Sequence, residues 1–212
     1  MAKILNFYNS SPNLKQLKEA ANLLIKGGLI IYPTDTVYAL GCLINQPKTL
    51  EKLAKLKGLK LEKAPFSFFF KNFEEISKYL KPLDNPTFKL LKRCLPGPYT
   101  FILPSLKLPK PFQKRKSIGI RISNHPVLNA LLDFLPVPLI TTSLHDQDKI
   151  IDYTTDPEII FDRWESDIDL MLVDGFGGNI PSTVIDLREG HPFLVRQGKG
   201  DLNLIYKKTR YL

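Results

Sequence analysis

Several segments that are rich in hydroxyl groups follow apolar runs of this sequence. Thr34 and Thr36 come after the run Leu29–Tyr32, Ser143 ends the segment PLITTS, and Ser182 precedes VIDL. Ligands of open α/β sheets bind beyond the carboxyl ends of the strands. We therefore expect these hydroxyls to converge, together with those of Thr141, Thr142 and Thr183.

Basic side chains occur near the same segments, namely Lys57, Lys60, Arg121 and Arg196. Arginine presents a planar fork of donors to phosphate oxygens, and hydroxyls and backbone N–H groups complete the shell. A single hydroxyl is more typical of a turn or a helix cap. The joint pattern, however, predicts a basic cleft that binds a polyphosphate, either ATP or an RNA backbone.

Other chemistries find less support in the sequence. It contains no Walker A, G-x-G-x-x-G, H-E-x-x-H or C-x-x-C motif. The three histidines are widely separated, which argues against a metal site. A Ser-His-Asp triad stays open, although no serine lies in a nucleophile elbow. Cys42 and Cys94 are too few for a disulfide framework and fit reduced thiols in the cytosol.

The composition is that of a globular protein with an excess of positive charge. Thirty Lys and Arg residues against 21 Asp and Glu residues give a formal charge of +9. This balance favours polyanionic partners, although a generally lysine-rich proteome would also produce it. The first residues lack the pattern of a signal peptide, and no apolar stretch reaches the roughly 20 residues of a membrane-spanning helix. We expect a cytoplasmic protein that does not bind a membrane. The sequence does not predict its oligomeric state.

The elements that position these residues alternate between helices and short strands. Apolar spacing predicts helices over 12–26, 47–57, 73–80, 86–94, 126–134 and 156–164, the first capped by Ser10 or Ser11. It predicts strands over 3–8, 29–32, 65–70, 100–103, 117–122, 138–142, 169–174, 182–187 and 192–196. The pattern indicates one α/β domain over 1–212 with a mixed sheet, a core at about 12–200 and a basic, loosely held tail within 201–212.

Six blocks of the sequence resemble the YrdC-like family in order and spacing. They are PTDTVYALG, LPGPYTFIL, SIGIRISNHPV, PLITTS, VDGFGG with PSTVIDL, and FLVRQGKG, and they extend over most of the chain. The best understood members are L-threonylcarbamoyladenylate synthases, which use threonine, bicarbonate and ATP to make an intermediate of tRNA modification. The resemblance implies a twisted mixed sheet with flanking helices around a basic cleft. It also implies Mg²⁺ with ATP as substrate, no tightly bound cofactor, and an association with double-stranded RNA or tRNA.

The resemblance also implies roles for individual residues. A substrate site would contain Thr34, Asp35, Thr36, Tyr38 and Ser182, and phosphate contacts would come from Lys57, Lys60, Arg121, Ser143 and Arg196. Lys57, Ser143 and His145 are the catalytic candidates.

At two positions the sequence departs from the synthases and resembles the YciO-like branch of the family. Leu59 stands where the synthases have the arginine of a lysine–x–arginine element, and His145 stands where they have an asparagine. Lysine cannot reproduce the bidentate fork of arginine, so Lys60 or Lys63 would compensate only in charge. This branch implies weak or absent synthase activity.

Three functions therefore compete. The first is an ATP-dependent synthase of acyl adenylates, and the second is a non-catalytic module that binds RNA, with affinity that falls steeply with salt. The third is a hydrolase of a threonylcarbamoyl-type adenylate or a modified RNA, with His145 as general base. Phe66, Phe68, Phe69 and Phe70 are more typical of a buried strand than of a base-stacking platform.

Overall fold

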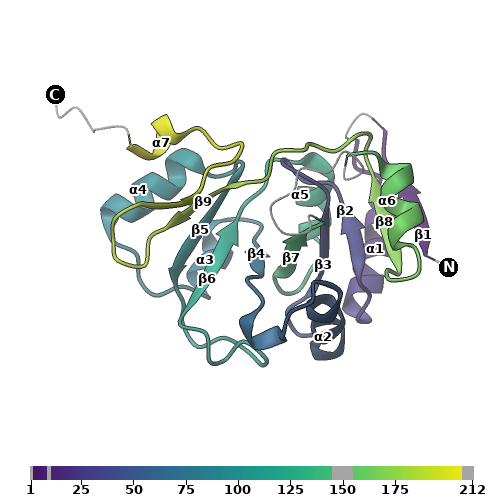
Figure 1. The fold of residues 1–212 in the computed structure, drawn as a ribbon, viewed down its shortest axis with the longest axis horizontal. Coiled ribbons are helices and arrows are strands. Elements are labelled where there is room, and N and C mark those ends of the chain that lie inside the picture. The colour runs from purple at the N-terminus through teal and green to yellow at the C-terminus, as the bar shows by residue number, and fades with distance from the viewer. Residues whose placement is uncertain (1, 9–10, 145–154, 207–212) are drawn as a thin grey trace.

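The computed structural model describes residues 2–8, 11–144 and 155–206. Within them, ten strands form one sheet in the order β1-β8-β2-β3-β7-β4-β6-β5-β9-β10 (Figure 1). The strands are β1 Lys3–Asn6, β2 Ile30–Tyr32, β3 Ala39–Leu43, β4 Ser67–Phe69, β5 Tyr99–Pro104, β6 Ser117–Arg121, β7 Leu139–Ser143, β8 Leu170–Val173, β9 Thr183–Asp186 and β10 Phe193–Arg196. Parallel pairs such as β4–β6 and antiparallel pairs such as β5–β6 both occur in this sheet. The predicted mixed sheet is confirmed.

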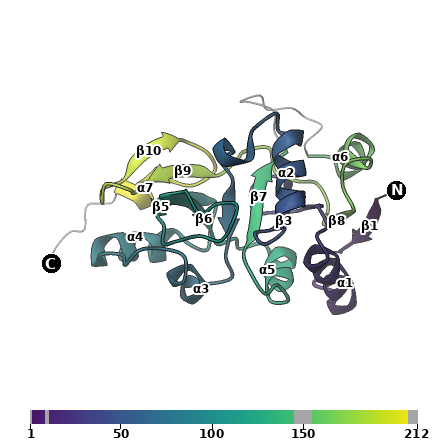
Figure 2. The same cartoon turned by 90° about the horizontal axis from the view of Figure 1, so that it is seen from below.

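Helices flank both faces of this sheet (Figure 2). They are α1 Leu14–Ile25, α2 Pro47–Leu56, α3 Phe73–Ser77, α4 Asn85–Cys94, α5 Pro126–Leu132, α6 Pro157–Trp164 and α7 Leu202–Tyr206, with a short 3₁₀ helix η1 at Leu61–Lys63. Leu17 of α1 and Leu128 of α5 belong to the same apolar cluster as Tyr32 of β2. Leu53 of α2 and Ile160 of α6 belong to a second cluster, which lies against the opposite side of the strands.

The pairing of the central strands aligns their residues in rows that run across the sheet. Two adjacent rows differ in the kind of side chain they carry. One row crosses β3, β7, β4, β6, β5 and β9 as Cys42, Ile140, Phe68, Ile120, Phe101 and Ile185, all fully buried. The adjacent row crosses the same strands as Gly41, Thr141, Ser67, Gly119, Ile102 and Asp186. Successive residues of a strand point to opposite faces. In these rows, one face of the central sheet is bulky and apolar, and the other carries mostly small or polar side chains.

The structure corrects two local predictions. The segment Ala39–Leu43, for which we predicted neither helix nor strand, is strand β3. Its central Gly41 conceals the strand pattern, yet an added Cβ there would meet the Ile140 carbonyl at 2.7 Å. The N-cap of α1 is Asn13, whose side chain accepts from two backbone N–H groups, instead of Ser10 or Ser11. Ser10 itself lies outside the described residues.

The start of the tail is also more ordered than predicted. Residues 202–206 form α7, and Ile205 is buried in the core. The remaining tail, 207–212, lies outside the described residues. Across the described ranges, none of the helices combines the length and the apolar character that a membrane crossing requires.

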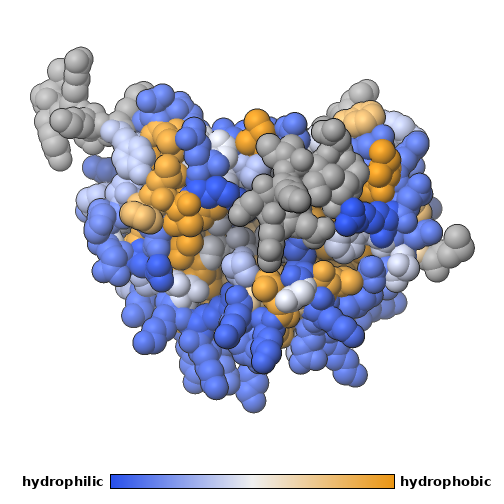
Figure 3. All heavy atoms as spheres, in the orientation of Figure 1, coloured by the Kyte–Doolittle hydropathy of each residue, from blue (hydrophilic) through white to orange (hydrophobic). Residues whose placement is uncertain are grey.

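Strand β10 is an edge of the sheet and exposes apolar side chains. Phe193 and Val195 are largely exposed, and in Figure 3 apolar residues gather where β9 and β10 lie in Figure 1. The pairing of β10 with β9 shifts between Leu194 and Arg196, so Val195 occupies a β-bulge. Bulges redirect side chains, and Val195 borders the cleft described next.

Candidate active-site cleft

A cleft of about 490 Å³ lies over the small-residue face of the central strands. Ser67, Gly119 and Thr141 contribute to it from one row across β4, β6 and β7. Because Gly119 has no side chain, the floor is low at its centre, and an added Cβ would lie 3.1 Å from Ser67 Oγ. The lining also includes Arg115, Arg121, Arg188 and Arg196, and it contains no Asp or Glu among the described residues.

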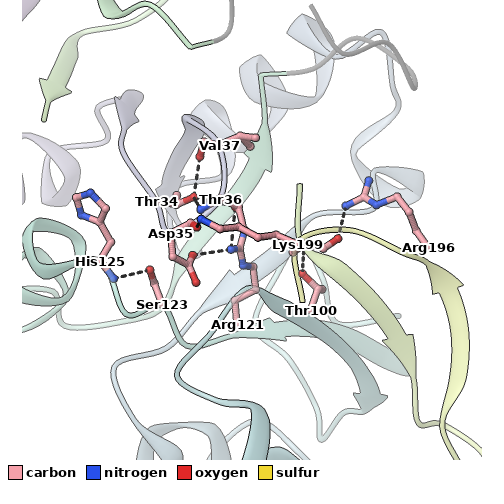
Figure 4. Close-up of polar contacts among 11 residues, drawn as sticks. Thr34, Asp35, Thr36, Val37, Thr100, Arg121, Ser123, His125, Arg196 and Lys199 are labelled. Atoms are coloured by element: carbon pink, nitrogen blue, oxygen red, sulfur yellow. Dashed lines mark hydrogen bonds and ion pairs between the residues drawn. The ribbon is translucent and has the colours of Figure 1, made fainter. Parts of the chain in front are cut away.

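One end of the cleft is built around a buried ion pair. Arg121 Nη2 lies 2.8 Å from Asp35 Oδ1, and both side chains are at least nine-tenths buried. The same Nη2 donates to Thr36 Oγ1 at 3.1 Å, and the guanidinium stacks on Phe69 with Cζ 4.6 Å from the ring centroid. Burial lowers the pKa of Arg121, and the Asp35 carboxylate opposes that shift. The pair fixes the Thr34–Thr36 turn against the end of β6 (Figure 4).

The turn itself is rigid because its hydroxyls bond within it. Thr34 Oγ1 donates to the Val37 carbonyl at 2.7 Å and accepts from the Thr36 N–H at 3.1 Å. Lys199 Nζ donates to the Asp35 carbonyl at 2.7 Å from the segment after β10 (Figure 4). The sequence PTDT thus places one carboxylate and two hydroxyls beside the cleft in a fixed arrangement.

The opposite wall comes from β5, β9 and β10. Thr100 Oγ1 and Ser182 Oγ lie 2.8 Å apart, and Arg196 Nη2 donates to the Ser182 carbonyl at 3.1 Å (Figure 4). Arg188 contacts both carboxylate oxygens of Asp186 through its Nε, at 3.0 and 2.8 Å. This wall presents hydroxyls and guanidinium groups to the same space as the turn.

A second polar pair lies behind the turn. His125 Nε2 is 3.4 Å from Asp174 Oδ2, and Ser123 Oγ accepts from the His125 backbone N–H. Burial lowers the pKa of His125, and the charges of Asp174 and Asp35 oppose this shift. The pair joins the start of α5 to the loop after β8.

The structure brings together only part of the predicted site. Thr36, Arg121, Ser143, Ser182 and Arg196 line the cleft, and Thr34 and Asp35 lie directly beside it. Tyr38 points elsewhere: its hydroxyl donates to the Gly175 carbonyl and accepts from the Asp174 N–H. Burial raises the pKa of Tyr38 to about 12.

Two other predicted residues are not in this lining, and a third lies outside the described residues. Lys57 is the half-buried C-cap of α2, and Lys60 is exposed just before η1. Neither belongs to the cleft as the described residues define it. His145 lies outside the described residues.

Sequence reasoning missed Thr100, Gly119 and Lys199 as residues at the site. Alternation along SIGIR and TFIL would have assigned Gly119 and Thr100 to the face opposite the bulky residues. Lys199 carries no comparable pattern, because its position depends on a loop.

Comparison with known proteins agrees with the family resemblance of the six sequence blocks. The family model Sua5_yciO_yrdC, described as "Telomere recombination", matches residues 22–198. The chain belongs to this family. YciO of Escherichia coli K12 is 37% identical over 206 residues, which are 95% of this chain and 98% of that protein. The crystal structure of E. coli YciO superposes with a TM-score of 0.88 at 36% identity, and covers 97% of this chain and 100% of that one. The resemblance to the YciO-like branch is thereby confirmed.

Two further relatives have more specific descriptions. Threonylcarbamoyl-AMP synthase of Marinobacter nauticus is 32% identical over 191 residues, which are 87% of this chain and 97% of that protein. Sua5 of P. abyssi, in a crystal structure with L-threonine, gives a TM-score of 0.85 at 25% identity. That comparison covers 96% of this chain but only 60% of the Sua5 chain.

Proposed function

We propose that the cleft binds ATP together with a small amino acid such as threonine, and that it forms an acyl adenylate from ATP and the amino acid after bicarbonate has carboxylated the amino group. The observation that carries this proposal is the buried Asp35–Arg121 pair, which holds the Thr34–Thr36 turn at one end of a cleft lined by hydroxyls and arginines. The family includes a threonylcarbamoyl-AMP synthase, and the P. abyssi Sua5 structure contains L-threonine. The volume of about 490 Å³ falls within the range of small-molecule sites.

The reaction suits the groups that line the cleft. A carboxylate oxygen of the N-carboxylated amino acid attacks the α-phosphorus of ATP, a new P–O bond forms, and pyrophosphate leaves with the electrons of the broken bond. Guanidinium groups in fixed positions neutralise the charge that grows on the leaving group. Mg²⁺ would arrive with ATP, and the phosphates would hold it, because the described lining offers no carboxylate.

The amino acid belongs at the turn in this proposal. Thr36 and Ser143 present hydroxyls there, and Arg121 provides a cation close to where a carboxylate group would lie. The polyphosphate belongs across the cleft from Arg121, where Ser182 and Arg196 form the wall. The roles of Lys57, Lys60 and Tyr38 as ligand contacts stay predictions, as does that of His145.

The test is calorimetric titration of the protein with ATP, with and without threonine and bicarbonate, combined with an assay of pyrophosphate. We expect threonine and bicarbonate to strengthen the binding of ATP and pyrophosphate to be released. Ser143→Ala should weaken both effects, whereas Ser77→Ala, at the exposed end of α3, should change neither. A folded protein that binds ATP no better with threonine and releases no pyrophosphate would contradict the proposal.

RNA binding in the same cleft is the alternative, favoured by the formal charge of +9. Phe66, Phe68, Phe69 and Phe70 are buried and are therefore not available to stack on bases, so this mode would depend on phosphate contacts. Binding of RNA that falls steeply with salt, in a protein that does not bind ATP, would favour this alternative. Hydrolysis of a threonylcarbamoyl adenylate that is abolished by His145→Ala, with nucleotide affinity kept, would favour the hydrolytic one.

A further inference from the structure

Arg115 is fixed in the cleft by contacts that leave its charge uncompensated. Its Nη2 donates to the carbonyl oxygens of Leu61 and Ala64, in the segment that follows α2. Its guanidinium stacks on Phe112, with Cζ 4.4 Å from the ring centroid. Phe112 is buried and packs edge-on against Phe68 of the core, at 5.6 Å between centroids. The guanidinium therefore has a defined position.

Two other arginines that line the cleft each have a carboxylate partner. Arg121 is paired with Asp35, and Arg188 is paired with Asp186. In the described part of the chain, Arg115 contacts only carbonyl oxygens and an aromatic ring. Burial lowers the pKa of Arg115, so its surroundings disfavour the charged form. A half-buried cation without a carboxylate is stabilised when an anion binds beside it.

The position of Arg115 along β6 identifies the part of the ligand it would meet. Arg121 ends the strand, and Arg115 lies two residues before its first residue, Ser117. The Cα atoms of Ser117 and Arg121 are about 13 Å apart at the usual rise of a strand. The two arginines thus lie near opposite ends of β6, and both line the cleft. A ligand that contacts both is elongated.

We propose that Arg115 binds the terminal phosphates of a polyphosphate ligand, at the end of the cleft opposite the Asp35–Arg121 pair. The identity of this ligand as ATP rests on the proposed function; the anion site itself does not. Only Nη2 is used by the two carbonyl groups, so Nε and Nη1 remain to donate to phosphate oxygens. A guanidinium that stacks on a ring and donates from two nitrogens matches the geometry of phosphate.

The experiment measures binding of inorganic tripolyphosphate, ATP and AMP by calorimetry at constant ionic strength. Arg115→Gln should weaken tripolyphosphate and ATP at least about 10-fold, because a charge-assisted hydrogen bond is lost. AMP lacks the terminal phosphates and should change less than about 2-fold. Lys116→Gln removes the same charge from the next, exposed residue and should leave all three affinities within about 2-fold. Arg115→Lys keeps the charge without the fork and should lose part of the tripolyphosphate affinity, which provides a second variant if glutamine prevents folding.

The outcomes separate this inference from the proposed function. Tripolyphosphate binding that depends on Arg115, in a protein that releases no pyrophosphate from ATP and threonine, supports the anion site and contradicts the synthase. Pyrophosphate release with an unchanged KM for ATP in Arg115→Gln overturns the anion site and leaves the synthase. Equal losses in Arg115→Gln and Lys116→Gln also overturn it, as does a folded wild-type protein that does not bind tripolyphosphate.

Discussion

The two faces of the central strands differ although they come from the same residues in alternation. Ile120 and Phe101 point into the apolar core and are fully buried, whereas their neighbours Gly119 and Ile102 line the cleft. The apolar face has no room for a ligand because its side chains fill it. The cleft face has room because glycine, serine and threonine occupy the equivalent positions. Along these rows, strand alternation thus places core packing on one face and the cleft on the other.

Hydrogen bonding at the cleft is incomplete. Arg121 Nε and Asp35 Oδ2 are buried there without a hydrogen-bond partner among the described residues. Buried polar atoms are nearly always hydrogen-bonded in proteins. A site that keeps such atoms loses stability, and we interpret this loss as the cost of positioning groups for a ligand or an ordered water.

The largest expected effect is a loss of stability when isoleucine is replaced by alanine, and it should differ between the two faces. Ile120→Ala removes a fully buried side chain and should lower the free energy of unfolding by about 2–5 kcal/mol. Ile102→Ala, on the partly exposed cleft face, should cost less than about half as much. Urea denaturation of both variants measures the difference. Equal losses would show that the cleft face is as tightly packed as the core.

A smaller effect should appear when the cleft floor is raised. Gly119→Val places methyl groups where the ligand would lie, and we expect affinity for ATP or threonine to fall about 10-fold. The cost in stability should stay below about 1 kcal/mol, because valine suits a strand and offsets its close contacts with Ser67 and Thr100. Gly119→Ala adds only the Cβ and provides a graded control in calorimetry. Full affinity in the valine variant would place the ligand away from this floor.

The sequence predicted most of the fold because the apolar runs were distinct. It missed β3, where Gly41 is required by the close approach of Tyr32 and Ile140, contacts that only the folded chain reveals. The hydroxyls at strand ends were predictable from the rule that ligands bind there. The contacts of Arg115 were not, because they involve stacking against Phe112 and carbonyl groups more than 50 residues earlier in the chain.

The smallest expected effect is a dependence of stability on pH, and it comes from the His125–Asp174 pair behind the turn. Burial lowers the pKa of His125 in the folded protein, so below the ordinary value of about 6.5 the unfolded chain binds a proton first. Its contribution to stability is therefore complete above that pH. It decreases as the pH falls toward the lower pKa of the folded state and then stays constant.

His125→Gln should remove this part of the slope of stability against pH between neutral and mildly acidic conditions. His191→Gln, at an exposed position, should keep the wild-type slope. Urea unfolding across this pH range measures both. A slope that persists in His125→Gln would show that groups other than His125 account for the acid sensitivity. The cleft end would then depend on the ion pair of Arg121 and not on a neutral histidine.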